Sequence, residues 1–305
     1  MSFGGTWDDQ PVKADIKAKA VKALKAALDC GINFFDHADI YCRGKSETVF
    51  AEAAAELGLR RDQMILQTKC GIRFSGDPVA SAPQRYDFSY EHIVASAEKS
   101  LKRLRIDYID VYLLHRPDAL VEPGEVARAF DYLHKSGKVR HFGLSNHTAA
   151  QMELLRKFVR QPIIANQVEL SLLHAHLIDA GIVPNQTKHS LGADGTLDYC
   201  RLHDITVQAW SPLAQGRAVG TQSKGQSDAR VETVGKVVAE IAERKGVSRE
   251  AVALAWLLRH PAGIQPVVGT MDPARISASC QSVNVELSRE EWYALFIAGR
   301  GERLP

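Results

Sequence analysis

The sequence predicts an α/β fold in which residues 1–305 form one domain, a (β/α)8 barrel. Short apolar segments alternate along the chain with longer amphipathic ones, which is the pattern of parallel strands joined by helical crossovers. The candidate strands number eight, the count that closes such a barrel. No shift in composition marks a linker, so a second domain is not expected. A doubly wound parallel sheet is the alternative that the same alternation allows.

The expected strands are apolar, rich in branched and aromatic residues, and bounded by polar turns. They span residues 3–7, 32–35, 64–67, 108–114, 139–144, 163–168, 206–210 and 265–268. The expected helices carry apolar residues on one face and span residues 46–57, 89–104, 149–158, 197–203, 231–244 and 249–259. Ser46 and Ser89 stand where an N-cap is needed, and Gly58 where the first of these helices ends.

Two polar connections, residues 174–195 and 213–229, are longer than ordinary turns. The second is rich in Gly, Ser and Gln, a composition typical of a mobile loop. Loops of this length are either flexible surface excursions or functional lids. We expect a lid, because the loop after the seventh strand of a barrel lies near the place where phosphate groups often bind.

Composition argues against several binding partners and against secretion or insertion into a membrane. The 38 Lys and Arg nearly balance the 36 Asp and Glu, so neither nucleic acid nor an anionic membrane is an expected partner. The first residues, MSFGGTWDDQ, lack the features of a signal peptide, and no apolar run approaches the roughly 20 residues of a membrane span. We expect a cytoplasmic protein. Its five cysteines contain no C-x-x-C pair, which predicts reduced thiols without a zinc site.

Four proton-handling side chains stand at or just beyond the ends of three predicted strands. They are Asp36, Tyr41, Lys69 and His115. In a parallel barrel these strand ends share one face, where the loops build the active site. Taken singly, each residue has a structural explanation, such as a loop cap or a solvated charge. Their joint placement favours an enzyme active site.

Eight motifs in sequence make the chain similar to the aldo-keto reductases. They are GTW at 5–7, D-x-A-x-x-Y at 36–41, Lys69, LLHRPD at 113–118, GLSN at 143–146, NQVEL at 166–170, WSPLAQG at 210–216 and GT followed by Arg275 at 269–275. The resemblance covers nearly the whole chain and includes a C-terminal helix with Trp292. It implies an NADPH-dependent reduction of aldehydes or ketones to alcohols, with NADH as a possible second cofactor. Relative to the family, we expect the chain to lack the hairpin that commonly closes the barrel's bottom.

The resemblance assigns catalytic roles that agree with the chemistry. Tyr41 is the general acid that protonates the carbonyl oxygen, and Lys69 is expected to lower its high pKa. Asp36 keeps Lys69 charged and placed. His115 donates to the carbonyl oxygen and orients the substrate. Trp7 and Arg116 join Tyr41 and His115 as expected substrate contacts with a small carbonyl compound.

The cofactor contacts are also implied by resemblance, since no G-x-G-x-x-G motif supports the Rossmann mode. Ser145, Asn146 and Gln167 match positions that bind the nicotinamide carboxamide, and Trp210 matches the ring on which nicotinamide stacks. The remaining expected contacts are Gly5, Thr6, Asp36, Ser211, Leu213, Gly216, Gly269, Thr270, Arg275 and Ser279. Arg275 would favour the 2'-phosphate of NADPH. Met271, Ala278 and Ser279 depart from the family's usual residues. Some of the family's contacts with the adenosine part of the cofactor are therefore expected to be absent or altered.

Three other functions stay open at this point. One is a barrel lyase that uses Lys69 for a Schiff base, another is a non-catalytic subunit that senses a nicotinamide cofactor, and the last is a purely structural barrel. The family's usual state predicts a monomer or a weak homo-oligomer. His37, His147, His174 and His176 are expected on the surface or in loops, and no HExxH motif indicates a metal.

Overall fold

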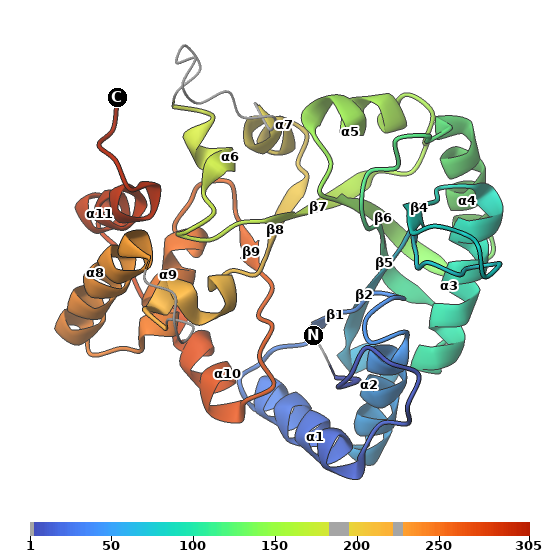
Figure 1. Ribbon diagram of the computed structural model, residues 1–305, viewed down its shortest axis with the longest axis horizontal. Coiled ribbons are helices and arrows are strands. Elements are labelled where there is room, and N and C mark those ends of the chain that lie inside the picture. The colour runs from blue at the N-terminus through green and yellow to red at the C-terminus, as the bar shows by residue number, and fades with distance from the viewer. Residues whose placement is uncertain (1–2, 183–194, 222–227) are drawn as a thin grey trace. The chain divides into compact units, whose positions relative to one another are not determined.

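The computed structural model describes residues 3–182, 195–221 and 228–305 (Figure 1). These residues form two compact units. The first comprises residues 1–166 and 271–273, and the second comprises residues 167–270 and 274–305. No helix in the described part of the chain is both long and apolar enough to cross a membrane. That residues 1–305 act as a single domain stays a prediction.

The first unit is built on parallel strands in the order β1 (Phe34–Asp36), β2 (Ile65–Cys70), β5 (Ile109–Leu114), β6 (Val139–Ser145) and the start of β7 (Ile163–Glu169). Helix α1 (Ala14–Asp29) precedes β1, and the helices between the strands are α2 (Lys45–Glu56), α3 (Tyr90–Leu104), α4 (Pro123–Lys135) and α5 (Ala149–Arg156). A short antiparallel hairpin, β3 (Ile72–Arg73) with β4 (Arg85–Tyr86), follows β2. A 3-10 turn, η1 (Arg61–Gln63), precedes β2.

The second unit continues from β7 to β8 (Thr206–Trp210) and β9 (Gln265–Pro266). Its helices are α6 (His176–Asp179), α7 (Thr196–Leu202), α8 (Ala229–Lys245), α9 (Arg249–Leu258), α10 (Pro273–Cys280, in this unit from Ala274) and α11 (Arg289–Arg300). Two 3-10 turns, η3 (Ala214–Val219) and η4 (Gln281–Asn284), complete it. Helices α9 and α11 are joined by Trp256 and Trp292, whose rings stack 5.3 Å apart and whose indole N–H groups each donate to the other's backbone carbonyl.

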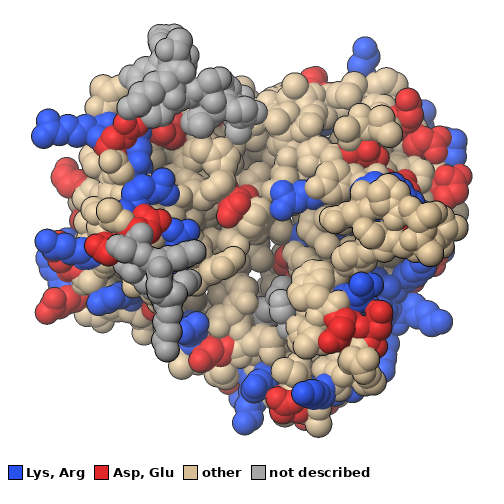
Figure 2. Space-filling model, in the orientation of Figure 1, with Lys and Arg blue, Asp and Glu red and all other residues tan. Residues whose placement is uncertain are grey.

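Burial follows the alternation of side chains along the strands. In the first unit Val111, Leu113 and Ala165 form an apolar cluster on one face of the sheet, with Phe34 and Ile164 against it. On the other face, the ring of Phe142 in β6 stacks 4.0 Å from that of Phe130 in α4. A strand buried on both faces by such contacts requires the continuous apolar sequences that predicted it. Lys and Arg side chains are interspersed with Asp and Glu on the surface shown in Figure 2.

Seven of the eight predicted strands overlap strands of the structure. The prediction for residues 3–7 was wrong: this segment is turn and irregular structure, in which Gly5 has a φ of 74°. Its hydrogen bonds run instead to the loop before α2, where Cys42 Sγ donates to the carbonyl of Gly5. Helices α1, α4, α6 and α10 were not predicted.

The cap of α3 was predicted correctly, because the Ser89 side chain accepts from the backbone N–H of His92. Ser46 does not cap α2, which begins at Lys45 after Gly44 in a left-handed conformation. The Ser46 hydroxyl instead accepts from the backbone N–H of Gly4. Of the predicted lid, residues 222–227 lie outside the described residues, as do residues 183–194 of the earlier long connection.

Candidate active site

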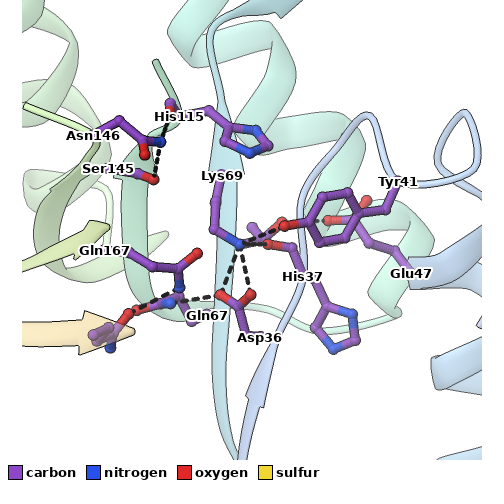
Figure 3. A network of polar contacts seen from close by, with 12 residues as sticks. Asp36, His37, Tyr41, Glu47, Gln67, Lys69, His115, Ser145, Asn146 and Gln167 are labelled. Atoms are coloured by element: carbon purple, nitrogen blue, oxygen red, sulfur yellow. Dashed lines mark hydrogen bonds and ion pairs between the residues drawn. The ribbon is translucent and has the colours of Figure 1, made fainter. Parts of the chain in front are cut away.

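The three strands of the first unit that carry the predicted catalytic residues are register neighbours. Asp36 is the last residue of β1 and pairs with Gln67 of β2, while Lys69 of β2 pairs with Leu113 of β5. His115 directly follows β5, and Tyr41 lies in the turn after β1. The sheet register therefore brings all four side chains together, as Figure 3 shows.

Lys69 is the centre of this group. Its side chain is fully buried, and its Nζ atom lies 2.8 and 2.7 Å from the two carboxylate oxygens of Asp36. The same nitrogen donates to the backbone carbonyl of His37 at 2.7 Å and to the Tyr41 hydroxyl at 3.2 Å (Figure 3). A phenol that accepts this bond still has its own O–H to donate.

The pair of Lys69 and Asp36 is held in its charged form. Burial opposes the charge on Lys69, but the Asp36 carboxylate and the Tyr41 oxygen outweigh it, and the pKa of Lys69 lies above its ordinary value. Burial likewise opposes the charge on Asp36, and the Lys69 ammonium holds the pKa of Asp36 below its usual range. Both groups are therefore ionised at neutral pH.

The pKa of Tyr41 differs from the expectation. Burial raises the pKa of the phenol above its ordinary value, and the opposing effect of the Lys69 charge is the smaller of the two. The Arg116 charge also acts to lower the pKa of Tyr41, but the two charges together do not outweigh the effect of burial. Tyr41 is thus fully protonated at rest, as a general acid must be.

His115 lies beside Tyr41, with the two rings in a T-shaped arrangement at 5.8 Å. Burial, reinforced by the Lys69 charge, lowers the pKa of His115 to about 3, so its imidazole is neutral in the physiological range. Its Nδ1 atom is buried without a hydrogen-bond partner among the described residues. A neutral imidazole carries one N–H donor.

Ser145 and Asn146 lie at the end of β6, close to His115. The Asn146 amide donates to the Ser145 hydroxyl at 2.9 Å and to the backbone carbonyl of His115 at 3.1 Å. Asn146 has a φ of 62°, a left-handed conformation that Asn tolerates better than most residues. The turn thus places polar side chains beside His115, which follows the neighbouring strand β5.

The N-terminal segment contributes an aromatic surface. Trp7 is 50% exposed, and its ring meets that of Phe74 edge to face at 6.5 Å. The Arg43 side chain donates to the carbonyl of Trp7 and lies over the Phe74 ring. Next to Trp7, the Thr6 hydroxyl donates to Asp8.

In the second unit the predicted cofactor residues occupy different environments. Gln167 is buried, with its amide donating to Gln208, and Trp210 is partly buried at the end of β8. Ser211 and Gly216, on either side of Leu213, have φ values of 51° and 91°.

The residues expected to contact the adenosine end of the cofactor follow β9. Gly269 and Arg275 are exposed and Thr270 is partly buried. Ser279 is buried, and its hydroxyl has no partner among the described residues.

Two of the histidines that were expected on the surface or in loops lie in loops but are buried. His37 is fully buried with its ring 4.5 Å from that of Phe50, and His147 is buried with Nδ1 2.9 Å from the carbonyl of Ser145. Both directly follow strand-end residues of the site, where the chain turns inward rather than out to solvent.

Two further buried residues of the first unit stand in or beside the site and were missed (Figure 3). Gln67 is fully buried, and its amide donates to Asp36 Oδ1 at 2.6 Å. It stands two residues before Lys69, so strand alternation places both side chains on the same face. Glu47, also fully buried, accepts from the Thr68 hydroxyl at 2.6 Å and pairs with Arg103 at 2.6 Å. The alternation could have found Gln67, whereas nothing in the sequence distinguishes Glu47 from a surface helix residue.

The family model described as the Aldo/keto reductase family matches residues 1–297. The chain belongs to the aldo/keto reductase family. Membership supports an enzyme with oxidoreductase activity, and the likeness to solved structures of this family confirms the predicted (β/α)8 barrel.

The proteins similar to this chain include reductases and a probable channel subunit. The 6-dehydroglucose reductase of Novosphingobium aromaticivorans is 38% identical over 294 residues, which cover 94% of this chain and 88% of that protein. A probable voltage-gated potassium channel subunit beta of Arabidopsis thaliana is 30% identical, with 93% and 87% covered. The structure of an aldo/keto reductase from Klebsiella pneumoniae in complex with NADP and acetate is 26% identical, with a TM-score of 0.70 and coverage of 93% and 86%.

Proposed function

We propose that this protein is an NADPH-dependent aldo-keto reductase that reduces an aldehyde or a ketone to an alcohol. The observation that carries the proposal is the contact of the Tyr41 hydroxyl with Lys69, whose ammonium is itself held by Asp36. A protonated phenol, a fixed cation and a neutral imidazole side by side are what proton delivery to a carbonyl oxygen needs.

The residues of the second unit fit a nicotinamide dinucleotide. The chain after β8 turns through positive φ at Ser211, Ala214, Gln215 and Gly216. The amides of Ala214 and Gly216 donate to backbone carbonyls within this turn, and turns of this kind can bind an anion such as a pyrophosphate through their other amides. Trp210 offers a flat aromatic face, and the exposed guanidinium of Arg275 suits a 2'-phosphate. When bound, the cofactor supplies the hydride.

The protein's own residues would act on the carbonyl oxygen. His115 donates its N–H to that oxygen and holds it toward Tyr41. Tyr41 then passes its proton to the oxygen while the carbon is reduced. The Lys69 ammonium stabilises the phenolate that remains, and Asp36 keeps Lys69 charged and fixed in place. Trp7 and Arg116 are the proposed substrate contacts beside this group.

The Schiff-base alternative is less well supported by the geometry. An amine attacks a carbonyl only when it is deprotonated. Lys69 has a raised pKa and donates to Asp36, so its lone pair is occupied by a proton.

The test is the fall in NADPH absorbance with a reactive aromatic aldehyde. We expect turnover by the wild type and a loss of at least about 100-fold in kcat for Tyr41→Phe, with NADPH binding retained. Tyr132→Phe is the matched control, because this residue is 41% exposed on α4, and it should keep the wild-type rate. A wild type that binds NADPH without turning over any of a panel of carbonyl compounds would favour the sensing subunit instead. A wild type that binds no dinucleotide would overturn the proposal.

A further inference from the structure

Three glutamine side chains stand on successive strands of the second unit. They are Gln167 on β7, Gln208 on β8 and Gln265 on β9. Gln167 and Gln208 are 1% and 3% exposed, and Gln265 is partly buried. Gln208 and Gln265 are direct partners in the parallel register of β8 and β9. Buried amides side by side on neighbouring strands must form hydrogen bonds with each other or pay a desolvation penalty.

The three amides form a chain with one direction. The Gln167 amide nitrogen donates to Gln208 Oε1 at 3.0 Å, and the Gln208 amide nitrogen donates to Gln265 Oε1 at 3.1 Å. If the Gln208 amide alone were turned over, its nitrogen would face the Gln167 nitrogen and its oxygen would face the Gln265 oxygen, and both hydrogen bonds would be lost. The orientation of each amide is therefore tied to that of its neighbour.

The direction of this chain has a consequence for Gln167. One of its N–H groups is committed to Gln208, so its oxygen is held on the opposite side of the amide. An amide oxygen accepts two hydrogen bonds. An oxygen in a fixed position can select a ligand that carries an N–H group, whereas an amide that turns freely presents donor and acceptor alike.

We propose that Gln208 and Gln265 are positioning residues that fix the amide of Gln167 to accept from the carboxamide N–H of the nicotinamide. This inference rests on the proposed function, in which Gln167 contacts that carboxamide. Gln208 and Gln265 themselves touch neither cofactor nor substrate. They would determine how strictly the enzyme requires a carboxamide on the cofactor's ring.

The experiment compares NADPH with its reduced 3-acetylpyridine analogue, whose acetyl group has no N–H. The measured quantity is the ratio of kcat/KM for NADPH to that for the analogue. The intrinsic reactivity of the analogue cancels when this ratio is compared between wild type and variant. Gln208→Met should lower the ratio about five- to tenfold, the effect of one hydrogen bond. Gln265→Met, one bond further along, should lower it about two- to threefold.

Two other variants separate orientation from general damage. Gln208→Glu still accepts from Gln167 and should keep the wild-type ratio within about twofold. Gln161→Met removes an amide of the first unit that donates to Asp131 at 2.7 Å, and should also leave the ratio unchanged. If Gln208→Met does not fold, Gln265→Met and Gln208→Glu carry the test.

The inference is overturned if Gln208→Met keeps the wild-type ratio, or if Gln208→Glu loses it as Gln208→Met does. A parallel measurement on Gln167→Met locates the failure. If Gln167→Met lowers the ratio but Gln208→Met does not, the orienting chain is refuted and the contact of Gln167 stands. If neither changes the ratio while the wild type reduces aldehydes, the orienting chain and the Gln167 contact are both refuted but the reductase function is retained.

Discussion

Asp39 links the stability of this protein to pH. It lies on the turn between Asp36 and Tyr41, and its backbone N–H donates to the carbonyl of Lys69 at 3.0 Å. Although the residue as a whole is partly exposed, its Oδ1 atom is buried and has no hydrogen-bond partner among the described residues. Burial, reinforced by the Glu47 carboxylate and opposed by Arg103, raises the pKa of Asp39 to about 7.

The sign of the effect follows from the two pKa values. The folded value of about 7 lies above the ordinary value of 3.8, so the folded protein holds this proton more tightly than the unfolded chain. The contribution of Asp39 to stability is therefore fully present below about pH 4 and is lost as the pH rises through 7. At 1.4 kcal/mol for each unit of pKa, the loss is at most about 4 kcal/mol, of which about 2–3 kcal/mol falls between pH 5 and pH 8.

Asp39→Asn removes the ionisation and nearly preserves the volume. The assay is urea unfolding of both proteins at pH 5 and pH 8, followed by tryptophan fluorescence. The stability of the variant relative to wild type should rise by about 2–3 kcal/mol at most between these pH values. Asp62→Asn is the control: the exposed Asp62 beside Arg60 has a lowered pKa and is ionised throughout this range, so the effect of the substitution should not change between pH 5 and pH 8. A stability difference between Asp39→Asn and wild type that does not change with pH would refute the reasoning.

Three more predictions concern the surroundings of the site. Gln67→Leu removes the 2.6 Å donor to Asp36, and kcat for aldehyde reduction should fall about tenfold while NADPH binding, measured by fluorescence, is kept. Glu47→Gln deprives the partly exposed Arg103 of its buried partner, so urea unfolding should show a loss of about 1–3 kcal/mol; an unchanged midpoint would contradict this. Burial lowers the pKa of His115 to about 3, so the pH profile of kcat/KM from pH 5 to 8 should have the same shape for wild type and His115→Gln. An inflection near pH 6.5 in wild type alone would show that His115 is not neutral throughout this range.

The strands that the sequence predicts correctly include strands whose side chains are buried on both faces of the sheet. Segments such as Ile109–Leu114 are buried at every position, and their continuous apolar sequence carries that information locally. Residues 3–7 contain two glycines among five residues and adopt a turn, in which Gly5 takes a positive φ and its carbonyl accepts from Cys42 in the loop before α2. Helices α1 and α4 were overlooked although each has an apolar face, with Ala20, Leu24 and Val126, Phe130 buried.

The sequence by itself determined the family, the order of the strands and the identity of Asp36, Tyr41, Lys69 and His115 as the candidate group, because motif spacing and strand periodicity are local properties. Only the tertiary structure decided their chemical state. The pKa of Tyr41 is raised rather than lowered, and His115 is neutral, because burial acts on these groups through every element packed around them. The direction of the amide chain from Gln167 to Gln265 is likewise absent from the sequence, since hydrogen bonds between residues 41 and 57 positions apart exist only once the strands are neighbours.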